Sequence, residues 1–197
     1  MPEIPSSADR AVRALADAVG DSRPRLPSDG TDPAIPVAAT VVIVRDGSAG
    51  PEVLMIERPD RGSFAGAWVF PGGKLDPADA GDEDETEEQV ARRAGVRETW
   101  EETGLHVELT RLLGVFGGAL YRARYSNGDE IAFVSTVFLA RPLRGTLKPD
   151  GEETLETRYF AQAELASLPM KPHVPPVLAI AFSGAPHAHF EPSTWTP

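Results

Sequence analysis

The stretch RETWEETGL, residues 97–105, is the most informative part of this chain. Glu98, Glu101 and Glu102 are three or four positions apart, so they share one face of a helix. Like charges about 4 Å apart repel by roughly 1 to 4 kcal/mol per pair between aqueous and surface-like dielectric. A bound cation relieves this repulsion, and ligands that are all oxygen suit magnesium or manganese. The spacing therefore predicts a site for Mg²⁺ or Mn²⁺ on this helix.

The alternative for a bare Glu-x-x-Glu-Glu pattern is an exposed acidic helix face that binds nothing. The neighbouring residues favour the metal site, because Arg97 and Gly104 extend the three glutamates to five fixed positions. At ordinary residue frequencies, such a match in a chain of this length arises by chance on the order of once in a few thousand sequences.

The helix that carries the glutamates has a recognisable start and end. Thr86 followed by Gln89 is a capping box and predicts the first turn, and Gly104 predicts the last. On the face opposite to the glutamates, Trp100 and Thr103 are expected to pack against the rest of the domain. This segment therefore predicts an amphipathic helix whose polar face is acidic.

Short extended segments on both sides of this helix predict an α/β domain. Asp46-Gly47 signals a turn between the first two strands, Asn127-Gly128 signals a hairpin, and Pro71-Gly72-Gly73 signals a turn before the acidic helix. The expected strands are Val37–Val44, Glu52–Glu57, Trp68–Phe70, Leu105–Val115, Tyr121–Tyr125, Ile131–Ala140 and Leu155–Phe160, and the later helices are Ala161–Ser167 and Pro176–Phe182.

RETWEETGL resembles the second half of the Nudix box, and Gly72-Gly73 resembles its opening. The resemblance covers roughly residues 37–182. It implies the α/β fold of that family, an αβα sandwich with a mixed β-sheet between helices. It also implies a Mg²⁺- or Mn²⁺-dependent hydrolase that cleaves the diphosphate linkage of a nucleoside diphosphate joined to another group.

The chain departs from the Nudix pattern between the glycines and the arginine. The family has a glutamate six residues after the box glycine, and the distance from Gly73 to Arg97 is about ten residues longer than in the family. Counting back from Arg97 gives Gln89 at the glutamate position, so this position is either lost or taken by Glu88 or Glu85.

The length of this insertion, with the Arg-Glu-Thr-aromatic-Glu-Glu core, is similar to the coenzyme A diphosphatase branch of the family. Gly66 and Arg58 partly match the additional motif of that branch, and a second arginine is displaced to Arg61. Coenzyme A or acyl-CoA, ADP-ribose, NADH-like dinucleotides and oxidised nucleotides therefore all stay open as substrates.

The resemblance implies a role for each residue of the box. The metal ligands are the carbonyl of Gly73 and the carboxylates of Glu98, Glu101 and Glu102, and Arg97 orients these carboxylates. These residues form the catalytic set together with a general base.

Residues outside the box complete the expected site. Glu152 and Glu153 precede the last strand, where many family members have a glutamate that acts as general base or as an additional metal ligand, and Glu153 is the candidate. Arg58 and Arg61 are candidates for binding phosphate, against the alternative that they are surface loop residues. Gly72 and Gly73 are expected to contact substrate.

A Nudix-fold sensor that binds a nucleotide without cleaving it is the competing hypothesis. Loss of one of the metal carboxylates would indicate such a module. All three are present, which favours the enzyme.

Composition excludes several other classes of protein. The chain has 197 residues, a formal net charge of -11 and no cysteine. The negative charge argues against long nucleic acids as partners, and the missing cysteines exclude disulfides and thiolate-bound zinc. No apolar run reaches about 18 residues, so no membrane span is expected and the protein is expected to be cytoplasmic. The expected partner is a small nucleoside diphosphate derivative, and a homodimer stays open.

Three segments are expected along the chain. Residues 1–36 are predicted to be an N-terminal helix, Ser7–Val19, with a proline-rich linker; residues 37–185 are the Nudix domain; and residues 186–197 are a C-terminal tail. Within the domain, the acidic stretch from Asp76 to Glu88 is predicted to be a solvated insertion. His173 is predicted to be a loop residue.

Strand alternation in the segment YRARY, residues 121–125, places its two tyrosines on one face and its two arginines on the other. This arrangement predicts either contact with a phosphate and a base, or a buried aromatic face below an exposed basic one.

Overall fold

The computed structural model describes residues 37–59, 66–81, 85–124 and 130–190. All of these residues belong to one compact unit, residues 35–197. The predicted helix Ser7–Val19, the linker up to residue 36 and the Asn127-Gly128 turn lie outside the described residues.

Strand β1 (Val37–Gly47) is the centre of the sheet. Its β-branched side chains favour the extended backbone. Val41, Val42 and Ile43 are fully buried, and so is Ala39. Its first part pairs with β4 and its last part with β2, both antiparallel, while β8 pairs in parallel along its other edge. The sheet is therefore mixed, as predicted.

The main sheet has the strand order β10-β5-β8-β1-β2-β3, and β9 pairs with β2. A separate hairpin is formed by β6 and β7. The other strands are β2 (Gly50–Glu57), β3 (Trp68–Val69), β4 (Gly72–Lys74), β5 (Leu105–Phe116), β6 (Arg122–Arg124), β7 (Glu130–Ala132), β8 (Val134–Gly145), β9 (Glu156–Ala161) and β10 (His189–Phe190).

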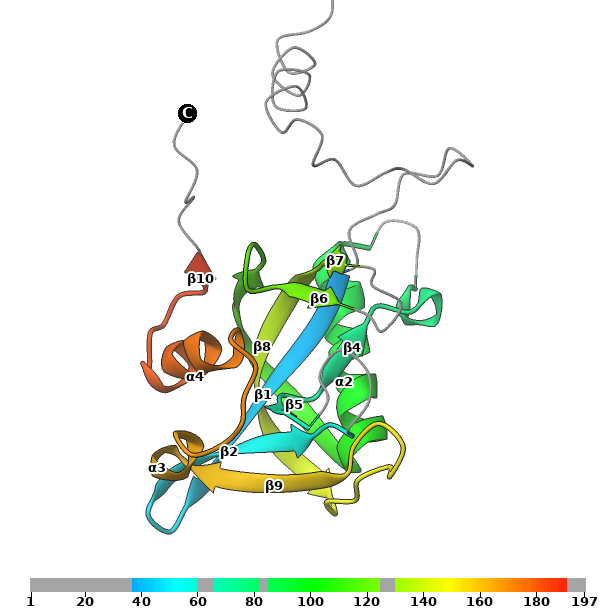
Figure 1. The fold of residues 1–197 in the computed structure, drawn as a ribbon. Helices are drawn as coiled ribbons and strands as arrows, with labels where there is room; N and C mark the ends of the chain where they lie inside the picture. The colour runs from blue at the N-terminus through cyan, green and yellow to red at the C-terminus, as the bar shows by residue number, and fades with distance from the viewer. Residues whose placement is uncertain (1–36, 60–65, 82–84, 125–129, 191–197) are drawn as a thin grey trace, which may run out of the picture. The chain divides into compact units, whose positions relative to one another are not determined.

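Helices cover both faces of this sheet (Figure 1). On one face, α2 (Glu87–Thr103) packs so closely on β1 that a β-carbon at Gly95 would lie 2.9 Å from Val41. On the other face, Val42 packs in one cluster with residues of α4 (Val174–Phe182). A short helix, α3 (Gln162–Leu165), follows β9. The predicted αβα sandwich is confirmed.

The predicted limits of α2 are correct. Thr86 accepts a hydrogen bond from the backbone N–H of Gln89, whose side chain accepts one from the N–H of Thr86. Gly104 ends the helix in the left-handed conformation, with φ of 73°. These two caps fix where the helix begins and ends.

Trp100 differs from its prediction. Thr103 is fully buried as expected, but Trp100 is 51% exposed. The residues of α2 that pack inward include Thr99 and Glu102, so the buried stripe is centred to one side of Trp100. A glutamate therefore occupies a position that hydrophobic patterning would assign to an apolar residue.

Two turns also differ from their predictions. The first hairpin turns at Ser48 and Ala49 rather than at Asp46-Gly47, because strand pairing continues to Gly47 opposite Gly50. Gly72 and Gly73 are not a turn but part of β4, which pairs with Ala38–Thr40 of β1.

The later strands differ in their limits. The predicted strand Ile131–Ala140 is divided at Phe133 into β7 and β8, and β8 continues past Pro142 to Gly145 beside β5. A register shift in β5 next to Val107, the partner of Pro142, accompanies this extension. Within the segment predicted as a tail, His189–Phe190 pair with β5 as β10.

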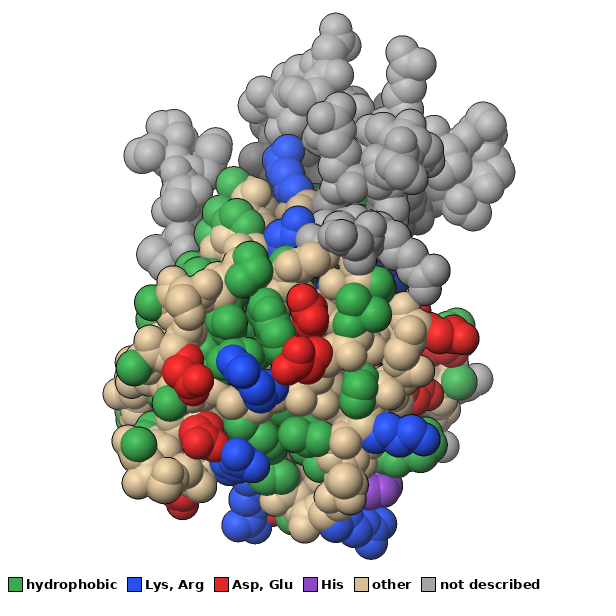
Figure 2. Space-filling view, turned by 60° about the horizontal axis from the view of Figure 1, so that its bottom comes forward, with side chains coloured by type: hydrophobic (Ala, Val, Ile, Leu, Met, Phe, Trp, Pro, Cys, Tyr) green, Lys and Arg blue, Asp and Glu red, His purple; other side chains and the backbone are tan. Residues whose placement is uncertain are grey.

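Within the described ranges, no helix has the length and apolarity that crossing a membrane requires. Figure 2 shows a face on which Lys and Arg side chains are interspersed with acidic and hydrophobic ones.

Candidate active site

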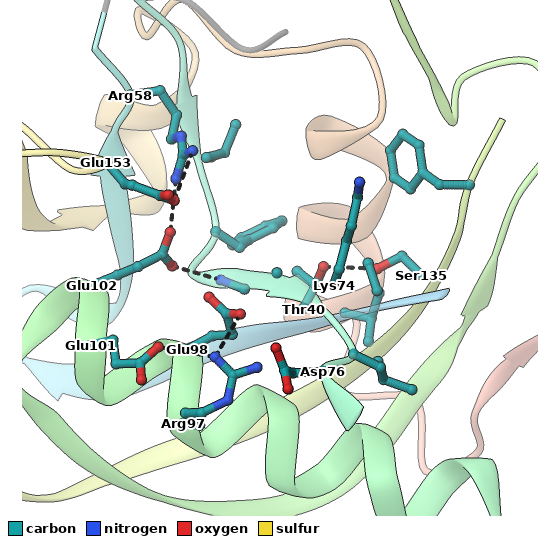
Figure 3. Close-up of a pocket in the computed structure, with 18 of the residues that line it drawn as sticks. Thr40, Arg58, Lys74, Asp76, Arg97, Glu98, Glu101, Glu102, Ser135 and Glu153 are labelled. Atoms are coloured by element: carbon teal, nitrogen blue, oxygen red, sulfur yellow. Dashed lines mark hydrogen bonds and ion pairs between the residues drawn. The ribbon is translucent and has the colours of Figure 1, made fainter. Parts of the chain in front are cut away.

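A cavity of about 990 Å³ opens where α2, β4 and the loop before β9 meet. All three glutamates of RETWEETGL line it, together with Arg58, Arg97 and Glu153. The side chains that the sequence predicted to act together therefore surround one space, although they come from different elements (Figure 3).

Glu102 is the buried member of the cluster, with only 2% of its surface exposed. One carboxylate oxygen accepts the backbone N–H of Gly72 at 2.8 Å, and the other accepts Nη1 of Arg58 at 2.8 Å. Burial raises the pKa of Glu102 to about 8, although the Gly72 N–H and Arg58 both favour the ionised form. The ionised form of Glu102 would therefore be stabilised by a further positive charge in the cavity.

The glycine pair allows β4 to lie close to both β1 and α2. A β-carbon at Gly72, whose φ is 147°, would overlap with the carbonyl oxygen of Ala39. A β-carbon at Gly73 would overlap with the carboxylate of Glu98. The predicted metal-binding glycine therefore lies directly against one of the predicted metal-binding glutamates.

Arg97 holds the two more exposed glutamates. Its Nη1 donates to Glu98 Oε1 at 2.9 Å and to Glu101 Oε2 at 3.0 Å. Burial raises the pKa of Glu98, against the opposing effect of Arg97. These contacts fit the predicted role of Arg97, which is to orient carboxylates.

Asp79 anchors Arg97, and sequence reasoning missed it. Both oxygens of its buried carboxylate accept from the guanidinium, Oδ1 from Nε and Oδ2 from Nη2, each at 2.8 Å. This bidentate pairing with Arg97 is the main reason why the pKa of Asp79 is lowered. The prediction that this stretch is merely a solvated insertion is wrong at this residue.

Asp79 lies six residues after Gly73, where the Nudix pattern has its glutamate. The additional residues follow Asp79 instead of preceding it, so counting back from Arg97 led to Gln89, which caps α2. The available signal was Asp76-Pro77-x-Asp79, a capping box that starts the short 3-10 helix η2 (Pro77–Asp79).

The two glutamates considered as substitutes for Gln89 have other partners. Glu85 forms an ion pair with Arg93, and Glu88 forms one with Arg92 at 2.7 Å. Neither glutamate lines the cavity. Asp79, rather than Glu85 or Glu88, therefore occupies the position of the Nudix glutamate.

The loop before β9 is organised by Asp150. Its Oδ1 accepts the backbone N–H groups of Glu152, Glu153 and Thr154 at 2.8 to 2.9 Å. Glu153 extends from this loop and accepts Nη2 of Arg58 at 3.3 Å, with 65% of its side chain exposed. Arg58 thus joins a buried and an exposed carboxylate. Arg61, the other predicted phosphate ligand, lies outside the described residues.

The opposite half of the cavity has hydroxyl and aromatic groups, with Lys74 of β4 beside them (Figure 3). Thr40 Oγ1 and Ser135 Oγ are 2.7 Å apart and share a hydrogen bond. Tyr121, Phe133 and His173 form a ring cluster with centroid separations of 5.3 to 6.1 Å. His173 lies in the turn before α4, as predicted, but it is partly buried, and burial lowers its pKa to about 4. At neutral pH its ring is uncharged.

The glutamate carboxylates of the cavity have the chemistry that a hard divalent cation prefers, but they are not yet arranged around a common point. Among the described residues, no three acidic or histidine side chains form a ready-made metal site. Arg58 and Arg97 are hydrogen-bonded to four glutamates, so the cluster keeps excess negative charge and its oxygens face arginine. Oxygen ligands of this kind suit magnesium or manganese.

Comparison with known proteins gives one consistent family. A family model described as "NUDIX domain" matches residues 35–179. A MutT-like protein from Streptomyces ambofaciens is 34% identical over 130 residues, which are 65% of this chain and 66% of that protein. The human 8-oxo-dGDP phosphatase NUDT18 is 32% identical over 125 residues, 62% of this chain but only 32% of that protein. The chain thus matches less than two thirds of the length of either relative.

The fold is also similar to that of solved NUDIX hydrolases. The crystal structure of a MutT NUDIX hydrolase from Burkholderia pseudomallei superposes with a TM-score of 0.54 at 30% identity. The match covers 73% of this chain and 95% of that one.

Asp79→Asn should destabilise the protein by about 2 to 3 kcal/mol, because it removes the negative partner of a guanidinium while keeping the shape of the side chain. Urea denaturation measures this loss. The matched control is Glu85→Gln, which breaks the more exposed pair with Arg93 and should have a clearly smaller effect. Equal losses in the two variants would contradict the anchoring role of Asp79.

The pKa of Glu102 also predicts how the stability of the metal-free protein depends on pH. Because the pKa is raised from 4.5 to about 8 on folding, the folded state binds this proton more tightly than the unfolded state. The stability that it contributes is complete below about pH 4.5 and is lost as the pH rises through about 8. Each pKa unit corresponds to about 1.4 kcal/mol.

Unfolding free energies measured in EDTA from pH 5 to pH 9 test this dependence. Wild type should lose stability over this range, and Glu102→Gln should lose clearly less, because glutamine carries no charge at any pH. The same slope in both proteins would show that Glu102 is not the strained acid.

Proposed function

Because the chain belongs to the NUDIX domain family, we propose that it is a divalent-metal-dependent hydrolase. It cleaves the diphosphate linkage of a nucleoside diphosphate joined to another group. The observation that carries this proposal is the convergence of Glu98, Glu101 and Glu102 on one cavity beside the glycine pair of β4.

The metal ligands would be the carboxylates of Glu98, Glu101 and Glu102 and the carbonyl of Gly73. When bound there, Mg²⁺ or Mn²⁺ supplies positive charge that offsets the diphosphate and polarises the phosphorus under attack. The raised pKa values of Glu98 and Glu102 support this assignment, because both acids lie where burial disfavours an uncompensated negative charge.

Arg97 is a positioning residue in this proposal. It donates to Glu98 and Glu101 while Asp79 holds its other side, so the guanidinium is fixed between a buried anchor and two ligands. It therefore limits the conformations of two flexible side chains, and this lowers the entropy lost on metal binding.

Arg58 and Glu153 face the substrate from the side of the cavity opposite to Arg97. The planar guanidinium of Arg58 suits paired phosphate oxygens, and its bonds to Glu102 and Glu153 keep it at the carboxylate cluster. Glu153 is the proposed general base. It takes a proton from water as the water oxygen bonds to phosphorus, and the bridging oxygen leaves with the other phosphate. The products are two phosphomonoesters, or a monoester and phosphate.

A nucleotide sensor without hydrolytic activity is the alternative function. It would require only the cavity, whereas this chain also has the three carboxylates and an exposed glutamate held by Arg58. The enzyme is therefore the better-supported function, and coenzyme A, ADP-ribose, NADH and oxidised nucleotides are the substrate classes to test.

A hydrolysis screen tests the proposal. The full chain, with Mg²⁺ or Mn²⁺, is incubated with coenzyme A, ADP-ribose, NADH, 8-oxo-dGDP and nucleoside triphosphates, and the phosphate products are separated by chromatography. At least one compound should be cleaved at its diphosphate linkage. Glu102→Gln should keep less than a tenth of the wild-type rate, a loss of at least about 1.4 kcal/mol of transition-state stabilisation.

Glu88→Gln is the matched control for this screen, because Glu88 lies on the same helix but pairs with Arg92 outside the cavity. It should cleave at the wild-type rate. Binding of these compounds without cleavage would indicate the sensor. A Glu102→Gln enzyme with more than a tenth of the wild-type rate would contradict the ligand assignment.

A further inference from the structure

Two arginines hold four of the glutamates that line the cavity (Figure 3). Each of them donates hydrogen bonds to two carboxylates, Arg97 to Glu98 and Glu101, and Arg58 to Glu102 and Glu153. Three of these four carboxylates are the proposed metal ligands. A metal ion at these ligands therefore has to share them with the arginines or to displace an arginine from them.

The two arginines differ in what else holds them. The guanidinium of Arg97 is fixed on its other side by Asp79, which accepts from Nε and Nη2 and is not a proposed ligand. Arg97 keeps this bidentate partner whatever binds to the glutamates. Among the described residues, the guanidinium of Arg58 forms ion pairs only with Glu102 and Glu153. Arg58 is therefore the arginine that can leave the carboxylate cluster without breaking a separate anchor.

The position of Arg58 conflicts with a divalent cation at Glu102. Nη1 of Arg58 lies 2.8 Å from Oε1 of Glu102, and Oε2 accepts the N–H of Gly72. Both oxygens of this buried carboxylate are thus already engaged. A doubly charged cation at the same carboxylate would be repelled by the adjacent guanidinium, and salt screens such repulsion only weakly where the charges are buried. The cation and Arg58 therefore compete for Glu102.

We propose that Arg58 is an internal counter-ion that a divalent metal ion displaces from Glu102. Without metal, Arg58 neutralises carboxylates and is not available to a diphosphate. With metal, its guanidinium is released into the cavity that it lines, where it binds phosphate oxygens. This inference rests on the proposed function, and it adds an order of binding in which the metal ion precedes the diphosphate.

The chemistry and the surroundings of Arg58 support this exchange. A guanidinium is planar with five N–H donors, and its geometry matches carboxylate and phosphate oxygens alike. The backbone N–H of Arg58 donates to the carbonyl of Ala67 at 3.0 Å, so the main chain stays in place while the side chain changes partners. Its bond to Glu153 is 3.3 Å long and the side chain of Glu153 is 65% exposed. Breaking an exposed ion pair of this kind costs little.

Lys74 is a second cation of the same cavity and provides a comparison. It is exposed, and among the described residues no carboxylate accepts a hydrogen bond from it or pairs with it. Its charge is therefore equally available with and without metal. If Arg58 only added positive charge to the cavity, it would behave in the same way. An internal counter-ion behaves differently, because it contributes to phosphate binding only after metal has released it.

NMR titration of the full chain with α,β-methylene-ADP, once in Mg²⁺ and once in EDTA, tests the inference. A methylene group replaces the bridging oxygen of this diphosphate, so the compound binds without being cleaved. Arg58→Met should weaken binding tenfold or more in Mg²⁺ but less than about twofold in EDTA. A tenfold change corresponds to about 1.4 kcal/mol. Lys74→Met is the matched control, and it should change the affinity by the same factor in both conditions.

The side-chain signals of the arginines report the displacement directly. Addition of Mg²⁺ without nucleotide should shift the Nε–H signal of Arg58. It should leave the Nε–H signal of Arg97 almost unchanged, because that group donates to Asp79. Arg58→Lys assigns the first signal by removing it. The same variant keeps the net charge but lacks the planar fork of donors. If Arg58→Met does not fold, Arg58→Lys should still weaken binding more in Mg²⁺ than in EDTA.

Equal weakening by Arg58→Met in Mg²⁺ and in EDTA would overturn the inference, because Arg58 would then be available without metal. An Arg58 signal that Mg²⁺ leaves unchanged would overturn it as well, and so would wild-type protein that does not bind the analogue in Mg²⁺. Failure of the proposed function has a different result. In that case the Mg²⁺-dependent effect of Arg58 persists, but no diphosphate compound of the hydrolysis screen is cleaved.

Discussion

The buried carboxylate of Glu102 is the constraint on which the rest of the site depends. Burial makes its ionised form unfavourable, and the protein offsets this with the Gly72 N–H and with Arg58. The first of these contacts requires β4 to lie between β1 and α2, and a β-carbon at Gly72 would overlap with the carbonyl oxygen of Ala39 in β1. One acid therefore ties the glycine pair, the helix and the loop arginine together, and it still has capacity for a cation.

The additional residues between the glycine pair and α2 are attached to this centre through Asp79. Its carboxylate holds Arg97, and Arg97 holds Glu98 and Glu101. The residues after Asp79 contact the helix through the pair of Glu85 and Arg93, away from the cavity. The residue that anchors Arg97 therefore lies before the additional residues, on the side of the glycine pair.

Local signals in the sequence predicted α2 and the common face of its glutamates, because caps and helical periodicity depend only on neighbouring residues. They could not predict the burial of Asp79, which depends on Arg97 18 positions later. They also could not predict the pair of Thr40 and Ser135, 95 positions apart, because it results from the parallel register of β1 and β8. Trp100 was assigned to the core by its hydrophobicity, but the buried stripe of α2 includes Glu102 instead. The buried side of α2 therefore carries an acid where hydrophobic patterning predicts an apolar residue.

The central claim is that the glutamates of α2 form a specific site for a divalent cation. Its most direct test is the melting temperature of metal-free protein in magnesium chloride and in sodium chloride at the same ionic strength. Magnesium should raise the melting temperature well above the effect of sodium, because at 100 times the dissociation constant a bound ion adds about 2.7 kcal/mol of stability. Glu98→Gln should melt at a higher temperature than wild type without metal and gain less from magnesium. Equal shifts in the two salts would contradict the claim, because screening of exposed charges depends only on ionic strength.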